Sequence, residues 1–144
     1  MRVSDVIGGT TTALITAAPR DTIADVVDLL KEYRIGAVVV TNADRMIVGI
    51  LSERDIVRHL SREQEGTLRL KVEDLMTTTV TTCRPDEDVD AAMTTMTAGR
   101  FRHMPIVDEL GKADGIVSMG DLVKARLGEL EGEVLELREY IGPT

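Results

Sequence analysis

The sequence predicts a mixed α/β (α+β) fold, in which two copies of one βαββα unit pack around a pseudo-two-fold axis and an amphipathic helix follows them. The main observation is an internal repeat: Gly49–Ile56 recurs 66 residues later as Gly115–Leu122, and the same shift relates the two halves from Thr16 onward without a gap. Each copy also alternates helical periodicity with short, β-branched apolar runs. Since one copy alone is too small to bury its apolar helices, the two copies should pack on each other.

The first copy supplies its elements in the order strand, helix, strand, strand, helix. A short helical turn at Val3–Ile7, ended by Gly8-Gly9, comes before them. The predicted elements are a strand at 14–16, a helix over about 22–34 capped by Thr22 or Asp21, strands at 36–40 and 47–51 joined by a turn at 42–44, and a helix over 53–59.

The second copy repeats this order. Its elements are a helical turn at 72–76, a strand near 80–82, a helix over about 87–99, strands at 103–107 and 113–117, and a helix from 119. We therefore divide the chain into a first repeat at residues 1–62, a linker at 63–71, a second repeat at 72–126 and a C-terminal helix at 127–144.

The C-terminal helix carries apolar residues at alternating spacings of four and three, with charged residues elsewhere. The six residues are Val123, Leu127, Leu130, Val134, Leu137 and Ile141. This a/d pattern fits a long amphipathic helix that packs on its own domain, and it also fits a helix that pairs across a dimer.

Composition restricts the classes of partner. The net charge of −8 and the pI near 4.8 argue against broad binding to nucleic acid or to anionic membranes. Cys83 is the only cysteine, so no intrachain disulfide can form. Met1-Arg2 does not begin a signal peptide, and no segment approaches the roughly 20 apolar residues that a membrane span requires. We expect a soluble cytoplasmic protein.

The repeated motif places a serine where a helix begins and an aspartate in the first turn of that helix. These residues are Ser52 with Asp55, and Ser118 with Asp121. A helix N-terminus offers backbone N–H donors and a positive dipole, which suit a phosphate. The aspartate can accept hydrogen bonds from both hydroxyls of a ribose. For one copy alone, a capped helix whose acidic residue only favours the dipole is the alternative interpretation.

The doubled motif, the strand ends at Pro19 and Pro85, and the run Arg102–Asp108 together resemble a tandem pair of cystathionine-β-synthase-type (CBS) domains. The resemblance covers about residues 3–126 and points to small stand-alone bacterial proteins that consist of one CBS pair. It implies two βαββα halves packed through their sheets and a homodimer in which two chains form a flat disc. It also implies binding of AMP, ADP, ATP, NAD(H) or S-adenosylmethionine in two clefts between the halves.

The resemblance assigns roles to residues of both clefts. The serine of each motif contacts phosphate, and the aspartate holds the ribose hydroxyls. Each cleft also borrows its adenine pocket and further phosphate contacts from the opposite half. For the Ser52 cleft these residues are Thr82, Arg84, Pro85, Arg102 and His103, with Arg54 from its own helix; for the Ser118 cleft they are Thr16, Ala17, Pro19, Gly36 and Ala37.

The two clefts differ in charge. Arg102, His103 and Arg54 can gather around a phosphate in the first cleft, whereas the second has Gly36 and Ala37 in place of the first two. Arginine makes strong charge-assisted contacts to phosphate. We therefore predict that the Ser52 cleft binds more tightly; the alternative is that Arg102 and His103 form a solvated strand edge.

The sequence contains no evident catalytic set. The two histidines, His59 and His103, lie in different halves, and Cys83 stands alone. The acidic residues at 86–90 fall where a helix begins, so they favour its dipole, and a divalent ion site is the minor alternative. We expect no enzyme activity, no catalytic cofactor and no metal.

Three functions remain open. The first is a regulator that senses an adenine nucleotide and signals to an unidentified protein partner. The second is a structural or oligomerisation module whose clefts are vestigial. The third is a redox-linked sensor that prefers NAD(H) to AMP.

Overall fold

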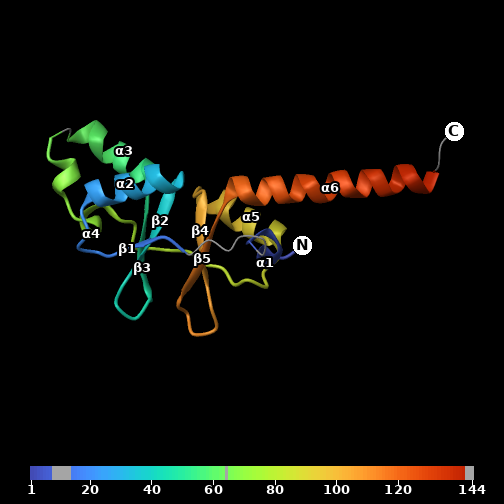
Figure 1. Ribbon diagram of the computed structural model, residues 1–144, viewed down its shortest axis with the longest axis horizontal. Helices are drawn as coiled ribbons and strands as arrows, with labels where there is room; N and C mark the ends of the chain where they lie inside the picture. The colour runs from blue at the N-terminus through green and yellow to red at the C-terminus, as the bar shows by residue number, and fades with distance from the viewer. Residues whose placement is uncertain (8–13, 64, 142–144) are drawn as a thin grey trace.

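The computed structural model describes residues 1–7, 14–63 and 65–141 (Figure 1). Its elements in chain order are α1 (Val3–Ile7), β1 (Thr16–Ala17), α2 (Ile23–Tyr33), β2 (Ala37–Thr41), β3 (Ile47–Ser52), α3 (Glu53–Arg62), η1 (Thr67–Arg69), α4 (Val72–Leu75), α5 (Val89–Gly99), β4 (His103–Val107), β5 (Ala113–Ser118) and α6 (Met119–Ile141).

The strand register is the same in the two halves. In the first half β1 runs parallel to β2, and β2 pairs antiparallel with β3 so that Val39 lies opposite Ile50. In the second half β4 pairs antiparallel with β5, and Pro105 lies opposite Ile116. The 66-residue shift relates these two pairs, and it also relates the register irregularities after Val40 and after Ile106. The repeat predicted from the sequence is therefore present in the sheets.

Each half has its own apolar core. In the first half, Val38 and Val40 of β2 pack with Ile23 and Val26 of α2. In the second half the core gathers residues of α5, β4, β5 and α6. The central valines of β2 are all fully buried, so this strand is covered on both faces. The two hairpins also meet, because the Arg45 guanidinium donates to the Ala113 carbonyl at 2.8 Å.

The predicted strand at residues 80–82 is wrong. The backbone N–H of Thr77 donates to the Ile50 carbonyl of β3 at 2.9 Å, and that of Cys83 donates to the Pro105 carbonyl of β4 at 2.9 Å. The segment between Thr77 and Cys83 thus crosses from one sheet to the other and cannot run along either of them. Within the described part of the chain, residues 80–82 form no strand, and a single-residue bridge joins the next residue, Cys83, to Ile106.

The short helical turns are exchanged between the halves. Val3 of α1 is buried in the core of the second half, and its N–H donates to the Glu87 carbonyl at 2.8 Å. Val72 of α4 is buried in the core of the first half, and its N–H donates to the Asp21 carbonyl at 2.7 Å. The 66-residue shift relates Asp21 to Glu87, so the pseudo-two-fold relation includes these turns.

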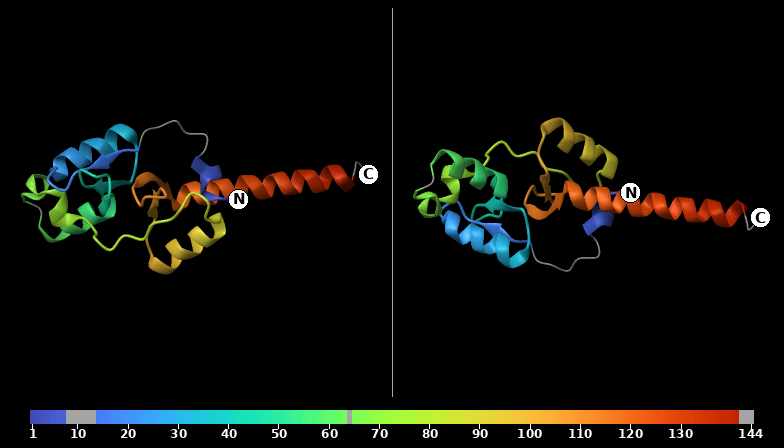
Figure 2. Two further views of the ribbon diagram at one scale, coloured as in Figure 1. Left: turned by 90° about the horizontal axis from the view of Figure 1, so that it is seen from below. Right: turned by 90° about the horizontal axis from the view of Figure 1, so that it is seen from above.

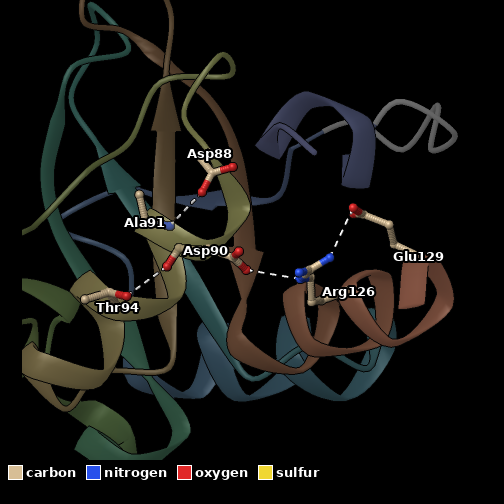
Figure 3. A network of polar contacts seen from close by, with 6 residues as sticks. All are labelled: Asp88, Asp90, Ala91, Thr94, Arg126 and Glu129. Carbon is tan, nitrogen blue, oxygen red and sulfur yellow. Dashed lines mark hydrogen bonds and ion pairs between the residues drawn. The ribbon is translucent and has the colours of Figure 1, made fainter. Parts of the chain in front are cut away.

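The helix α6 is continuous from Met119 to Ile141, with no break at the predicted boundary between residues 126 and 127. It projects from the body of the molecule, as both directions of view show (Figures 1 and 2). An ion pair ties its first half to α5: Arg126 Nε lies 3.3 Å from Asp90 Oδ1, and Arg126 Nη1 lies 3.1 Å from Glu129 Oε1 (Figure 3). The last predicted residues of this helix, 142–144, lie outside the described part of the chain, as do Gly8-Gly9.

The a/d residues of α6 do not pack on the domain. Their exposed fractions run from 37% at Val123 to 72% at Ile141. The helix instead contacts the domain through another face, on which Leu122 is fully buried and Arg126 is half-buried. Among the helices in the described ranges, none is long and apolar enough to cross a membrane.

Candidate functional site

The repeated Ser–Asp motif forms a capping box at the start of α3. The Ser52 hydroxyl accepts from the Asp55 N–H at 3.3 Å, while Asp55 Oδ2 accepts from the Ser52 N–H and from the Ser52 hydroxyl, both at 3.0 Å. The second copy has the same arrangement at the start of α6. There the Ser118 hydroxyl accepts from the Asp121 N–H at 3.0 Å, and the Ser118 N–H donates to Asp121 at 3.4 Å. The predicted helix starts are therefore confirmed in both halves.

The chain before each hairpin holds the neighbouring helix N-terminus in place. The first helical N–H of α3, from Glu53, donates to the Gly36 carbonyl at 2.9 Å, and the equivalent N–H of α6, from Met119, donates to the Arg102 carbonyl at 2.8 Å. The amide of Arg54 lies between the amides of Glu53 and Asp55, which already have partners. A phosphate at this helix end would thus meet the Arg54 amide and the field of the helix.

A cavity of about 330 Å³ opens in front of the Ser52 helix start. Segments from both halves line it, which agrees with a cleft between the repeats. The predicted residues among its lining are Gly36, Ser52, Arg54, Asp55, Arg102 and His103. Gly36, which the sequence interpretation gave to the other cleft, therefore lies in this one. A pocket of this size falls within the range of about 300–1,000 Å³ that small-molecule ligands occupy.

The cavity gathers positive charge in an acidic protein. Four arginines line it, Arg54, Arg58, Arg100 and Arg102, and the acidic residues of its lining are Glu53 and Asp55. The chain as a whole carries a net charge of −8. Such a local excess of guanidinium groups suits an anionic ligand, because arginine pairs with phosphate oxygens in a bidentate manner.

Sequence reasoning missed two of the four arginines. Arg58 lies one helical turn after Arg54, so the i, i+4 spacing on a predicted helix places both on one face. Arg100 ends α5 in the left-handed region, with φ at 58°. Its nearness in sequence to Arg102 was the available signal.

Another part of the cavity lining comes from the segment that crosses between the sheets. Thr77, Thr79, Val80 and Thr81 line the cavity, together with Ile50, Gly99 and Phe101. The predicted Thr82 and Pro85 lie outside this lining. The Pro85 carbonyl accepts instead from the Ser4 N–H at 2.8 Å, and the Arg84 N–H donates to the Glu87 carboxylate at 3.2 Å. The chain around Pro85 therefore contacts α1 and does not line the cavity.

Ser118 lies in a different setting. It borders an open groove of about 810 Å³ together with Arg102, His103 and the first turns of α6, including Gly120, Val123 and Lys124. The other residues predicted for this cleft do not line the groove: Thr16, Ala17, Pro19, Gly36, Ala37 and Asp121. Thr16 and Ala17 form β1, Ala37 is buried at the start of β2, and the Pro19 carbonyl accepts from the Glu73 N–H at 2.9 Å. The 66-residue shift pairs Thr77–Thr79 with residues 11–13, which lie outside the described residues.

His103 borders both the cavity and the groove. Burial lowers the pKa of its imidazole below the usual value, and the Arg102 guanidinium lowers the pKa further, while the carboxylates of Glu53 and Asp121 act in the opposite direction. The ring lies against Gly36, where an added methyl group would come within 3.1 Å of His103 Cε1 and Nε2. The absence of a side chain at Gly36 is what makes room for the ring.

The acidic stretch at 86–90 makes internal contacts. Asp88 caps α5 by accepting from the Ala91 N–H at 3.2 Å, and Asp90 pairs with Arg126 (Figure 3). Within the ranges that the structure describes, no three His, Cys, Asp or Glu side chains are grouped as a metal site would need.

Comparison with known proteins identifies the repeat. A family model for the CBS domain matches residues 3–62 and 72–128. The chain is 38% identical over 117 residues to an uncharacterized 17.7 kDa protein of Acidianus ambivalens, and the match covers 81% of this chain and 70% of that one. It is 34% identical over 125 residues to the mitochondrial CBS domain-containing protein CBSX3 of Arabidopsis thaliana, covering 84% of this chain and 60% of the relative.

Solved structures agree with this family. A CBS-domain containing protein from Agrobacterium tumefaciens superposes with a TM-score of 0.82 at 37% identity, covering 88% of this chain and 99% of that one. CBSX2 in complex with AMP gives 0.73 at 27% identity, with coverages of 88% and 96%. The CBS domain pair of protein MJ0100, in complex with 5′-methylthioadenosine and S-adenosyl-L-methionine, gives 0.79 at 25% identity, with coverages of 90% and 98%. Because the family model matches most of the chain in two successive copies, the chain belongs to the CBS-domain family as a tandem CBS pair.

Proposed function

We propose that this chain is a non-enzymatic regulatory module that binds an adenosine-containing nucleotide in the Ser52 cleft and signals its presence to a protein partner. The observation that carries the proposal is the concentration of four arginines around a capped helix N-terminus, in a cavity between the two repeats of an acidic protein. Two structural relatives, CBSX2 and MJ0100, are in complex with AMP or with other adenosine derivatives, which supports the adenosine part of the ligand.

The proposed ligand position follows from the chemistry of the walls. The phosphates lie at the start of α3, within reach of Arg54, Arg58 and the Ser52 hydroxyl. The ribose hydroxyls donate to Asp55. The adenine ring packs against the apolar side chains of Ile50, Val80 and Phe101, which line the same cavity.

The charge of the cleft narrows the class of ligand. Guanidinium groups favour anions and disfavour a cationic sulfonium. We therefore place AMP, ADP, ATP and NAD(H) ahead of S-adenosylmethionine. The Ser118 groove has fewer cations along its walls, with Arg102 and Lys124 as its lysine and arginine residues, so we propose that it binds these nucleotides more weakly.

A second candidate function is a structural or oligomerisation module with vestigial clefts. The exposed apolar face of α6 favours it, since such a face is typical of a surface that pairs with another protein. The homodimer and the unidentified protein partner belong to either proposal. A redox-linked sensor is a variant of the first proposal in which the cleft prefers NAD(H) to AMP as its ligand.

The test is a calorimetric and thermal-shift panel with AMP, ADP, ATP, NAD⁺, NADH and S-adenosylmethionine. It compares the wild type with Asp55→Ala and with Asp25→Ala. Asp25 forms the same capping box with Thr22 at the start of α2, with bonds of 3.0 and 3.2 Å, and it lies outside the cavity. Both substitutions should lower stability by about 1 kcal/mol through the lost cap.

The expected result is a rise in melting temperature with an adenine nucleotide in the wild type and in Asp25→Ala, and its loss in Asp55→Ala. If no compound of the panel shifts the wild type, the vestigial module is correct. Equal losses in the two variants would mean that Asp55 acts through stability and not through the ligand. Asp121→Ala completes the set: a larger loss there than in Asp55→Ala would reverse the ranking of the two clefts.

A further inference from the structure

The six a/d residues of α6 form an unpartnered apolar face, which we call the α6 seam: Val123, Leu127, Leu130, Val134, Leu137 and Ile141. All six are exposed by 37% or more. The seam is about 27 Å long at 1.5 Å per residue. It continues beyond the part of α6 that rests on the domain, and its C-terminal half lies on the projecting end of the helix (Figure 2). An exposed apolar face of this length is typical of a surface that contacts another protein.

We propose that the α6 seam packs against the α6 seam of a second copy of this chain, in a parallel and in-register two-stranded coiled coil. This proposal is independent of the Ser52 cleft, because no seam residue lines that cavity. Two seam residues, Val123 and Leu127, do border the Ser118 groove. The proposal fixes the partner, the face and the relative direction of the two helices, and each of these follows from a separate feature of the helix.

The seam residues match those of a parallel dimer. Counting Leu127 as an a position, the a residues are Leu127, Val134 and Ile141, and the d residues are Val123, Leu130 and Leu137. Two of the three a residues are β-branched, and two of the three d residues are leucine. Parallel two-stranded coiled coils favour β-branched residues at a with leucine at d.

The charged residues beside the seam determine whether the two helices run parallel or antiparallel. The residues flanking the seam are Lys124, Glu131 and Arg138 at e, and Arg126, Glu133 and Tyr140 at g. In a parallel in-register pair, each g residue meets the e residue five positions later in the other chain. Arg126 then faces Glu131 of the partner subunit, and Glu133 faces Arg138 of the partner subunit. Symmetry doubles both attractive contacts.

The antiparallel arrangement sets like charges against each other. Matching a with d layers in opposite directions places e residues against e, and g residues against g. Lys124 then faces Arg138 of the partner subunit, while Glu131 and Glu133 each face their own counterparts. Like charges in such positions destabilise pairing, so the same sequence that favours the parallel pair disfavours the antiparallel one.

The pair formed by Glu133 and Arg138 is the one to test. Arg126 already pairs with Asp90 and Glu129 within its own chain. A change at Arg126 would therefore alter these intrachain ion pairs as well as the contact across the dimer. Neither Glu133 nor Arg138 has an ion pair within the described part of the chain. Their five-residue spacing also keeps them from meeting along one helix. The seam lies on a continuous helix that Arg126 ties to Asp90 of α5, so pairing has to order little new backbone.

The first experiment is disulfide trapping in the full-length protein. Leu137→Cys places a thiol at a d position, where a parallel in-register pair brings the two copies of residue 137 together. In the antiparallel pair they lie about 15 Å apart, beyond the reach of a disulfide. Glu139→Cys, on the opposite side of the helix, is the matched control. Native Cys83 is 1% exposed, and the wild type serves as the control for its contribution.

The expected result is an oxidised dimer with Leu137→Cys and little with Glu139→Cys or the wild type. Equal yields from the two variants would overturn the seam as the interface. No dimer from either, with a monomer in sedimentation, would overturn the second copy as the occupant. In that monomer, slow alkylation of the residue 137 thiol would mean that α6 covers its seam on its own domain.

The second experiment uses charge reversal and reads dimer dissociation by sedimentation. Arg138→Glu replaces two attractive contacts by repulsive ones in the parallel dimer, so dissociation should become about tenfold easier. Adding Glu133→Arg to the same chain restores opposite charges and should recover most of the loss. In the antiparallel pair Arg138→Glu would instead face Lys124 and tighten the dimer, so a tighter dimer would overturn the parallel direction.

Discussion

The imidazole of His103 lies against the α-carbon of Gly36, at the point where the two repeats meet in front of the Ser52 cleft. A methyl group on Gly36 would lie 3.1 Å from His103 Cε1 and Nε2. These two residues come from equivalent regions of the two repeats, just before or at the start of β2 and β4. The glycine and the ring are therefore complementary: a small residue in one repeat leaves room for a titratable ring from the other.

Gly36→Ala should weaken nucleotide binding in the Ser52 cleft. The new methyl group must displace the His103 ring, which lines the cavity. We expect a stability loss of about 1 kcal/mol, within the range for overpacking, and a several-fold loss of affinity in calorimetry. Gly128→Ala is the control, because a methyl group there meets nothing within 4 Å. Unchanged affinity in Gly36→Ala would show that the ring position is unimportant for the ligand.

Nucleotide affinity should rise as the pH falls through the titration of His103. Burial lowers the pKa of this imidazole, so the ring is neutral near pH 7 in the free protein. A bound phosphate favours the imidazolium and raises that pKa, so binding takes up a proton. Calorimetry from pH 8 to pH 6 on the wild type and His103→Gln measures the effect, and their difference removes the titration of the phosphate itself. Parallel profiles would exclude His103 from the phosphate site.

The stability of the ligand-free protein should change in the opposite direction with pH. The unfolded chain binds the proton at the ordinary histidine pKa of about 6.5, whereas the folded chain binds it only at lower pH. Stability contributed by the neutral ring is therefore present above about pH 6.5 and is lost as the pH falls toward the lowered folded pKa. His103→Gln should show a smaller loss over this range in denaturant titrations.

Arg58→Gln should separate phosphate recognition from adenosine recognition. Arg58 lines the cavity, while Arg62, one turn further along α3, does not. A charge-assisted hydrogen bond contributes about 1.5–3 kcal/mol, so we expect at least a tenfold loss of AMP affinity and little change for adenosine. Arg62→Gln is the matched control on the same helix. Equal losses for AMP and adenosine would place Arg58 away from the phosphate.

Cys83 should resist alkylation until the protein unfolds. The side chain is 1% exposed, and burial, with a contribution from Glu87, raises the pKa of its thiol to about 11. Because the thiolate is the reactive form, iodoacetamide at pH 8 should label the native protein far more slowly than the protein in denaturant. The labelling rate then measures opening of the second core. Rapid labelling without denaturant would contradict the burial of this residue.

The repeat made most of the fold predictable. A gapless shift of 66 residues fixed the order of the elements, and Ser52 and Ser118 marked two helix starts through their capping chemistry. The strand expected at 80–82 is absent for a reason that the local sequence pattern does not show. Its threonines favour extended backbone, yet the segment has to join Ile50 in one sheet to Ile106 in the other.

The site was predictable where it follows the motif and less so where it depends on packing. Ser52, Asp55, Arg102 and His103 lie around one cavity as expected. The part of the lining that was expected from Thr82 and Pro85 comes instead from Thr77, Thr79, Val80 and Thr81, because the chain there crosses between the halves. Gly36 was expected in the Ser118 cleft but lines the Ser52 cavity. Its contact with His103 depends on how the two sheets pack against each other, and the spacing of residues in the sequence does not give the distance between the sheets.

The exchanged turns bear on how the molecule folds. Val3 is buried in the core of the second half and Val72 in that of the first, so neither half closes its core with residues from its own hairpin alone. Loss of either half would leave a valine-sized gap in the other and release the backbone bonds to Asp21 or Glu87. We therefore expect the two repeats to unfold as one cooperative unit and not as two independent domains.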